Sequence, residues 1–227
     1  YLQVDLPYDS TLNTTFWTNR VGFRLIKKVE FYIGNILLDR QYGSWMHIWS
    51  ELSNSNEKKH ILNNIVGPKS INGNSLGFKA NQKRTLNIPL TFFFCKDYFS
   101  SLPLFAIKNK DIYLKFFFEK KENCIQTGSV PSDDLSNMRL LADYIFLDKE
   151  ESLKFVQTEL NYVYETNLRF ERNLVSSGTK TFVLPFNLPT KELIWVNKTL
   201  NNSKDKFTNF TNNGKESINS IQFKING

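Results

Sequence analysis

The sequence contains few of the residues that usually form catalytic or metal centres. Among 227 residues there are two cysteines, Cys95 and Cys124, and two histidines, His47 and His60. Their positions give no metal-ligand spacing, and no glycine-rich phosphate loop or Ser/Cys nucleophile motif is present. We therefore expect no metal, no cofactor and no enzymatic activity.

Long apolar runs and a secretory leader are also lacking. No apolar run approaches the roughly 18 residues of a membrane helix, and residues 1–6 already alternate as a strand. Cys95 ends a predicted buried strand and Cys124 lies in a polar loop, so we expect two reduced thiols and an intracellular origin. Because the chain does not begin with Met, we expect a piece of a longer polypeptide.

Neither sign of charge is in large excess. There are 29 basic and 22 acidic residues, which gives a net charge of +7. Many lysines lie close to acids, and this pattern favours an ordinary solvated surface. A face that contacts an anionic membrane or nucleic acid is the alternative.

Aromatic residues are abundant: 20 Phe, 9 Tyr and 4 Trp. Apolar side chains alternate through residues 86–95 and again through 111–118, and the apolar stretch 102–107 lies between them. Alternation places one set of side chains on a single face of each strand. The sequence therefore predicts two buried strands in a thick β core, as expected of an architectural protein.

Other elements follow from local patterns. Residues 25–38 predict a hairpin with Gly34-Asn35 at its turn. Trp45, Ile48, Trp49 and Leu52 have helical spacing, and Ser44 is placed to cap the predicted helix. We expect loops at 53–84 and 120–138, a central sandwich strand at 140–147, and a capped helix at 148–155.

We place a domain boundary near residue 150, between predicted domains 1–149 and 150–227. Strands are predicted at 160–164, 179–186, 193–196 and 218–225. So few strands cannot close a sandwich, and their open edges need a partner.

Four strings in the same order resemble the major capsid proteins of nucleocytoplasmic large DNA viruses, which include the iridoviruses, phycodnaviruses and mimivirus-like viruses. They occupy residues 42–52 (YGSWMHIWSEL), 88–95 with 102–107 (IPLTFFFC and LPLFAI), 142–151 (ADYIFLDKEE) and 191–196 (KELIWV). The motif and core residues on which the resemblance rests are Trp45, His47, Trp49, Pro89, Phe92, Phe94, Pro103, Asp143, Tyr144, Asp148 and Trp195.

The resemblance implies an all-β, antiparallel jelly-roll sandwich with short helices in its loops: the first jelly roll of a double jelly roll, and the opening strands of the second. The family's amino-terminal segment and most of the second jelly roll are not in the sequence. It also implies self-association into trimeric, pseudo-hexagonal capsomers of an icosahedral shell, in a virion assembled in the host cytoplasm. Minor capsid proteins and an internal membrane would be further partners, and no specific nucleic acid is expected.

Several features are interpreted as structural rather than functional. His47 is expected to be a satisfied structural histidine, and the acid pairs Asp133–Asp134 and Glu150–Glu151 are not held across a cleft as a glycosidase requires. Formal glycosylation acceptors are Asn13, Asn197, Asn201 and Asn209. In a chain this rich in asparagine such matches arise by chance, and we expect little occupancy.

Two alternatives to a shell protein remain open. A carbohydrate-binding jelly roll would need exposed aromatic or acidic clusters on a loop rim. A basic nucleic-acid-binding β protein would place aromatics beside lysines on an exposed sheet face, and Tyr113, Lys115 and Phe117 do alternate with the core residues. We expect a neighbour's sheet or the following loop to cover that face.

Overall fold

The structure, a computed structural model, describes residues 1–69, 77–107, 109–159, 161–173, 178–198, 207–210 and 218–224. The strands are β1 (Leu2–Asp5), β2 (Phe16–Trp17), β3 (Ile26–Ile33), β4 (Ile36–Gln41), β5 (Thr85–Ile88), β6 (Ile112–Phe118), β7 (Ile125–Thr127) and β8 (Ser136–Leu140). The helices are α1 (Val21–Leu25), α2 (Gly43–Ser53), α3 (Asn56–Ile65) and α4 (Lys149–Gln157), with short 3-10 turns η1 (Phe93–Cys95), η2 (Tyr98–Ser100) and η3 (Lys121–Asn123).

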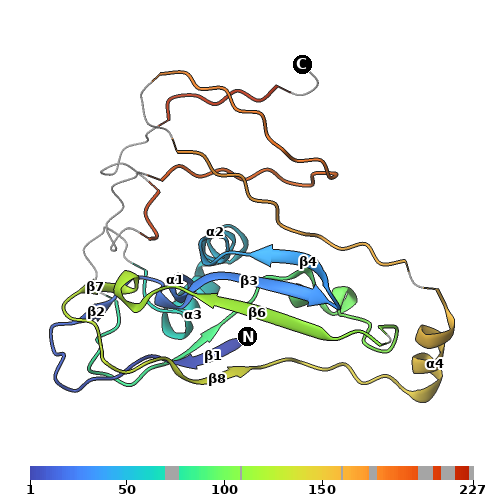
Figure 1. Ribbon diagram of the computed structural model, residues 1–227, viewed down its shortest axis with the longest axis horizontal. Coiled ribbons are helices and arrows are strands. Elements are labelled where there is room, and N and C mark those ends of the chain that lie inside the picture. The colour runs from blue at the N-terminus through green and yellow to red at the C-terminus, as the bar shows by residue number, and fades with distance from the viewer. Residues whose placement is uncertain are drawn as a thin grey trace.

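The strands form antiparallel sheets, as predicted. One sheet has the order β5-β1-β8, a second has the order β4-β3-β6, and β2 pairs with β7. Figure 1 shows these strands as one β body, with α4 at one end and the residues after it leading to a separate layer of extended chain. The apolar core lies within the β body, where Val4, Phe31 and Leu86 are fully buried.

The predicted hairpin is present as β3 and β4. Gly34 takes a φ of 58°, which a glycine adopts without the Cβ clash that other residues meet. Across β3, Val29 and Phe31 pair with Phe116 and Leu114 of β6 on the inner face.

The predicted Phe-rich strand at 86–95 is only partly correct. β5 ends at Ile88, because Pro89 follows it and proline has no N–H to donate to a ladder. Phe93 to Cys95 then form a 3-10 turn, and the apolar stretch 102–107 lies in a loop. The rings still cluster, although not on one pleated face.

The predicted helix at 44–52 exists, but its buried face was predicted wrongly. Met46, His47 and Ser50 are the buried side chains, whereas Trp45 and Trp49 are half-buried and Leu52 is 61% exposed. Ser44 does not cap the helix, which begins at Gly43. A Cβ at Gly43 would lie 1.9 Å from the carbonyl oxygen of Phe23, so glycine is what allows α2 to abut α1.

Two predicted loops contain regular structure. Helix α3 lies inside the polar segment 53–84, and η3, β7 and the start of β8 lie inside 120–138. The α4 helix agrees with its prediction, since the Asp148 side chain accepts a hydrogen bond from the Glu151 N–H at 2.8 Å.

The apolar stretch 140–147 was predicted as a central sandwich strand, and this is wrong for the described chain. β8 ends at Leu140, and the residues beyond it are extended but exposed, with Phe146 at 91%. The prediction rested on apolar residues on both faces of the segment, and such residues are buried only if other parts of the protein cover both faces.

The predicted strands beyond residue 160 are not paired in the described residues. Residues 161–173 and 178–198 are extended chain without ladder hydrogen bonds, and Val163 and Val183 are almost wholly exposed. Residues 160 and 225 fall outside the described part. Such segments need strands from elsewhere, as the sequence suggested.

The two cysteines are free thiols, but their surroundings were predicted the wrong way round. Cys95 is exposed on a 3-10 turn, and Cys124 is buried. Burial raises the pKa of the Cys124 thiol to about 12. Within the described ranges no helix has the length and apolarity needed to cross a bilayer.

Candidate functional site

A cluster of phenylalanine rings packs the segment after β5 against the inner face of β3. The centroid of the Phe31 ring lies 5.8 Å from that of Phe92, 6.3 Å from Phe93 and 4.9 Å from Phe94. Phe31 and Phe92 are fully buried. Tilted and edge-on pairs at these distances stabilise a core beyond the burial of their area.

Next to this cluster, a buried carboxylate joins β4 to the carboxyl-terminal chain. Asp39 Oδ1 accepts hydrogen bonds from the Thr166 hydroxyl (2.8 Å), the Asn167 N–H (3.0 Å) and the Arg40 N–H (2.8 Å). Asp39 Oδ2 accepts one from Gln41 Nε2 at 2.9 Å. We call the contacts between residues 161–171 and the β body the joint.

Aromatic contacts flank this carboxylate. The ring of Phe93 lies 5.3 Å from that of Tyr164 and 6.0 Å from that of Tyr162. The Tyr162 hydroxyl donates a hydrogen bond of 2.7 Å to the carbonyl of Ser101. The joint therefore combines ring packing with hydrogen bonds. Because hydrogen bonds are directional, they orient residues 161–171 on the β body as well as holding them there.

Ion pairs complete the joint at its exposed rim. Glu165 pairs with Lys191 and Lys96, whose hydrogen bonds lower the pKa of the Glu165 carboxyl to about 2. The Arg169 guanidinium lies 4.4 Å from the centroid of the Tyr42 ring. Exposed ion pairs and cation–ring contacts each add little to the free energy of unfolding. Their main effect here is to orient the side chains at the rim of the joint.

His47 occupies a second contact between the β body and the carboxyl-terminal chain. It is buried on α2, and its ring lies 6.4 Å from Phe23, 5.9 Å from Phe207 and 6.1 Å from Phe210. Its Nδ1 has no hydrogen-bond partner in the described residues, and the nearest carboxylate oxygen, Glu51 Oε1, is 4.0 Å away. The expectation of a structural histidine is consistent with this packing, but its hydrogen bonding is not satisfied at Nδ1.

The pKa of His47 is lowered to about 4. Burial is the main cause, because it disfavours the imidazolium; the Glu51 charge opposes the shift, and the charges of Arg20, Lys69 and Lys198 reinforce it.

Glu51 gathers several cations from different elements. Its oxygens lie 2.8 Å from Lys69 Nζ, 3.5 Å from Arg20 Nη2 and 3.9 Å from Lys59 Nζ. Arg20 is buried, and its Nη1 also donates to the Gly67 carbonyl at 3.2 Å. Burial alone would raise the pKa of Glu51, but the Lys69 hydrogen bond and the neighbouring positive charges hold that pKa below its usual value. Glu51 thus links α1, α2, α3 and the chain after α3.

The lowered pKa of His47 predicts a pH-dependent stability. Between the unfolded pKa of 6.5 and the folded pKa of about 4, the unfolded chain binds more protons, so stability falls as the pH falls through this window. The loss amounts to roughly 3 kcal/mol over the whole window, at 1.36 kcal/mol per pKa unit. We expect the denaturant midpoint to drop between pH 6.5 and 5.

His47→Gln is the matched variant for this measurement. The substitution removes the titrating group, so the plot of denaturant midpoint against pH should be flatter between pH 6.5 and 5. This holds even if the substitution also changes the stability at pH 7. An unchanged slope in His47→Gln would show that another group carries the pH dependence.

The other predicted motif residues are spread over the molecule. Trp45 and Trp49 stack on each other at 5.7 Å, Pro89 ends β5, and Pro103 lies in the loop after η2. Asp143 and Tyr144 are exposed beyond β8, and Asp148 caps α4. The ring centroids of Trp195 and Phe223 lie 5.1 Å apart. His47, Phe92 and Phe94 lie in the contacts described above, and the centroid of the Trp49 ring lies 5.4 Å from Nζ of Lys96, which pairs with Glu165. The roles of all these residues stay predictions.

The formal glycosylation acceptors also differ in their surroundings. Asn13 is exposed in the loop after β1 and its Oδ1 accepts a hydrogen bond from Asn81 at 2.7 Å. Asn197 and Asn209 are half-buried, and Asn201 lies outside the described residues.

Sequence reasoning missed the residues that hold these contacts together. Asp39 directly follows the predicted hairpin 25–38, and Thr166 lies 127 positions away. Glu51 had a weak signal, since it follows His47 by one helical turn, where the two side chains share a face. In the described ranges no three His, Cys, Asp or Glu side chains gather as metal ligands.

The arrangement is that of a β sandwich whose contacts serve to hold parts of the chain together, and this is the jelly-roll class seen in viral capsid proteins. Two structural comparisons support that fold. PBCV-1 VP54, fitted into a cryo-EM reconstruction of the virophage Sputnik, matches with a TM-score of 0.60 and 21% identity over 73% of this chain and 38% of that one. A quasi-atomic model of the PBCV-1 virus capsid matches with a TM-score of 0.59 and 22% identity, with the same coverage.

The sequence comparisons identify the family. Residues 2–148 match the family described as "Major capsid protein N-terminus", and the chain belongs to it. The chain is 32% identical to the major capsid protein of Phaeocystis pouchetii virus, over 86% of this chain and 45% of that protein. It is 28% identical to capsid protein 1 of Acanthamoeba polyphaga mimivirus, over 86% of this chain and 35% of that protein. The chain therefore spans less than half the length of these relatives.

Proposed function

We propose that this chain is the amino-terminal part of a structural capsid protein of a large DNA virus, without catalytic activity. In this proposal copies of the complete polypeptide form trimeric, pseudo-hexagonal capsomers that tile an icosahedral shell in the virion. Residues 1–149 are the first jelly roll, and residues 150–227 open the second. Minor capsid proteins and an internal membrane are further neighbours.

The family match over residues 2–148 carries the proposal. The physical character of the chain supports it: a close-packed aromatic core gives a rigid wall, and the joint fixes the direction in which the chain leaves that wall. The described residues after 160 are not paired, as expected for the opening strands of a second sandwich whose other strands lie outside this chain. The carbohydrate-binding alternative receives no support from the relatives, which are capsid proteins.

The test is assembly of the complete polypeptide that carries this chain. We expect sedimentation velocity and native mass spectrometry to show trimers, and electron microscopy at higher concentration to show hexagonal arrays. Residues 1–227 alone should instead self-associate irregularly, because their unpaired strands are exposed. A complete polypeptide that stays monomeric at every concentration would contradict the proposal.

A further inference from the structure

One face of the β4-β3-β6 sheet is rich in cations and aromatic rings. The strand register places its residues opposite one another: Lys28 faces Phe117, and Tyr32 faces Tyr113. We call it the basic aromatic face, and its members are Lys28, Tyr32, Arg40, Tyr113, Lys115 and Phe117.

This face has more positive than negative charge. Its one carboxylate, Glu30, is buried, and it accepts bonds of 2.7 Å from both Lys28 Nζ and Arg40 Nε. The Tyr32 hydroxyl also donates to Glu30, at 3.0 Å. Lys115 lies opposite Glu30 in the register but contacts rings instead, with its Nζ 4.7 Å from the Tyr32 centroid. The face thus has three cations and one carboxylate, and that carboxylate binds two of the cations, Lys28 and Arg40.

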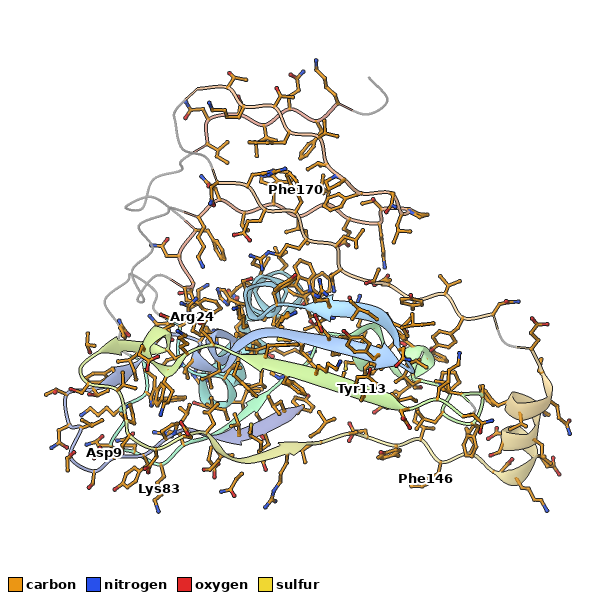
Figure 2. All side chains as sticks on the ribbon, viewed as in Figure 1. Asp9, Arg24, Lys83, Tyr113, Phe146 and Phe170 are labelled. Carbon is orange, nitrogen blue, oxygen red and sulfur yellow. The ribbon has the colours of Figure 1, made fainter. Side chains whose placement is uncertain are left out.

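The rings on this face are already ordered. Tyr32 and Tyr113 stack with centroids 5.0 Å apart and planes 9° apart, and Lys28 Nζ lies 4.1 Å from the Phe117 centroid. Figure 2 shows Tyr113 on β6, near the start of that strand. Aromatic side chains and arginine are enriched among the residues that dominate protein interfaces. Rings that are already ordered also lose little side-chain entropy when a partner covers them.

The same chain carries a segment of complementary chemistry. Residues 143–151, which we call the acidic segment, contain four acids and one lysine, and all five side chains are exposed. The aromatic side chains of the segment are exposed as well, Tyr144 at 68% and Phe146 at 91%. Segment and face therefore match in charge and in aromatic character.

Within one copy the two surfaces are apart. In Figure 1 the chain leaves β8 and runs to α4 at the end of the molecule without crossing β3 or β6. Figure 2 places Phe146 on that path, away from Tyr113.

We propose that the basic aromatic face receives the acidic segment of a second copy of this chain. The contact joins two different patches, so it is head-to-tail, and a head-to-tail contact of suitable rotation closes into a ring. This inference deepens the proposed function and rests on it, because it names the surfaces through which copies meet.

Charge reversal in the complete polypeptide tests the pairing. Lys115→Glu and Glu150→Lys should each raise the concentration for half-assembly about tenfold, because like charges then face each other. The double variant should return it to within about threefold of the wild type. Lys58→Glu, at an exposed position of α3, is the matched control and should leave assembly unchanged.

The outcomes separate the two proposals. Wild-type assembly that neither single variant weakens, or a double variant no better than the singles, overturns this contact and leaves the proposed function standing. A wild type that does not assemble overturns both. Salt-sensitive binding of a single-stranded oligonucleotide that Lys115→Glu abolishes, with assembly intact, would reassign the face to nucleic acid.

Discussion

Phe31→Ala is expected to lower the free energy of unfolding by about 3–5 kcal/mol. The Phe31 ring is fully buried and contacts the rings of Phe92, Phe93 and Phe94. Its removal leaves a cavity that these neighbours cannot fill, because they are fixed to the segment after β5. Chemical denaturation followed by tryptophan fluorescence measures the loss.

Phe99→Ala is the matched control for this variant. It makes the same chemical change on η2, where the side chain is 99% exposed, and should shift stability by less than about 0.5 kcal/mol. If Phe31→Ala were as mild as Phe99→Ala, the ring cluster would not be the centre of the core.

Glu51→Gln is the second variant with a large expected effect. It keeps the size of the side chain but removes the charge that faces Arg20, which is 1% exposed. An uncompensated buried cation is costly, so we expect a loss of roughly 3 kcal/mol, the lower end for breaking a buried pair, because Glu51 itself keeps some exposure. Thermal and denaturant unfolding at pH 7 measure it.

Glu57→Gln provides the comparison for Glu51→Gln. Glu57 is an exposed acid in the first turn of α3, and its neutralisation should cost at most a few tenths of a kcal/mol, through the helix dipole. Equal effects of the two substitutions would mean that Glu51 does not compensate Arg20.

The sequence predicted elements well wherever a local pattern determines them. The hairpin of β3 and β4 follows from alternation around Gly34, and α4 follows from the Asp148 cap. Local patterns were misleading where the burial of a side chain depends on contacts with residues far away in the sequence. The period of α2 was correct, but spacing alone could not show that Met46 and His47, rather than Trp45 and Trp49, face the core.

The contacts of the joint could not be predicted from the sequence. Asp39 follows the last residue of the predicted hairpin 25–38, and nothing in its neighbourhood indicates hydrogen bonds from Thr166 and Asn167. Likewise, Leu141 and Phe146 read as core, yet they are exposed because no described strand covers them.

By itself the sequence determined the antiparallel β class, the β3–β4 hairpin, the helix cap at Asp148 and the resemblance that placed the chain among capsid proteins. These depend on side-chain periodicity and short motifs, which act within a few residues. Only the tertiary structure decided which face of α2 is buried, that Glu51 gathers cations from several elements, and that Asp39 holds the carboxyl-terminal chain. Those contacts join residues far apart in the sequence, and their energies depend on burial that no local pattern specifies.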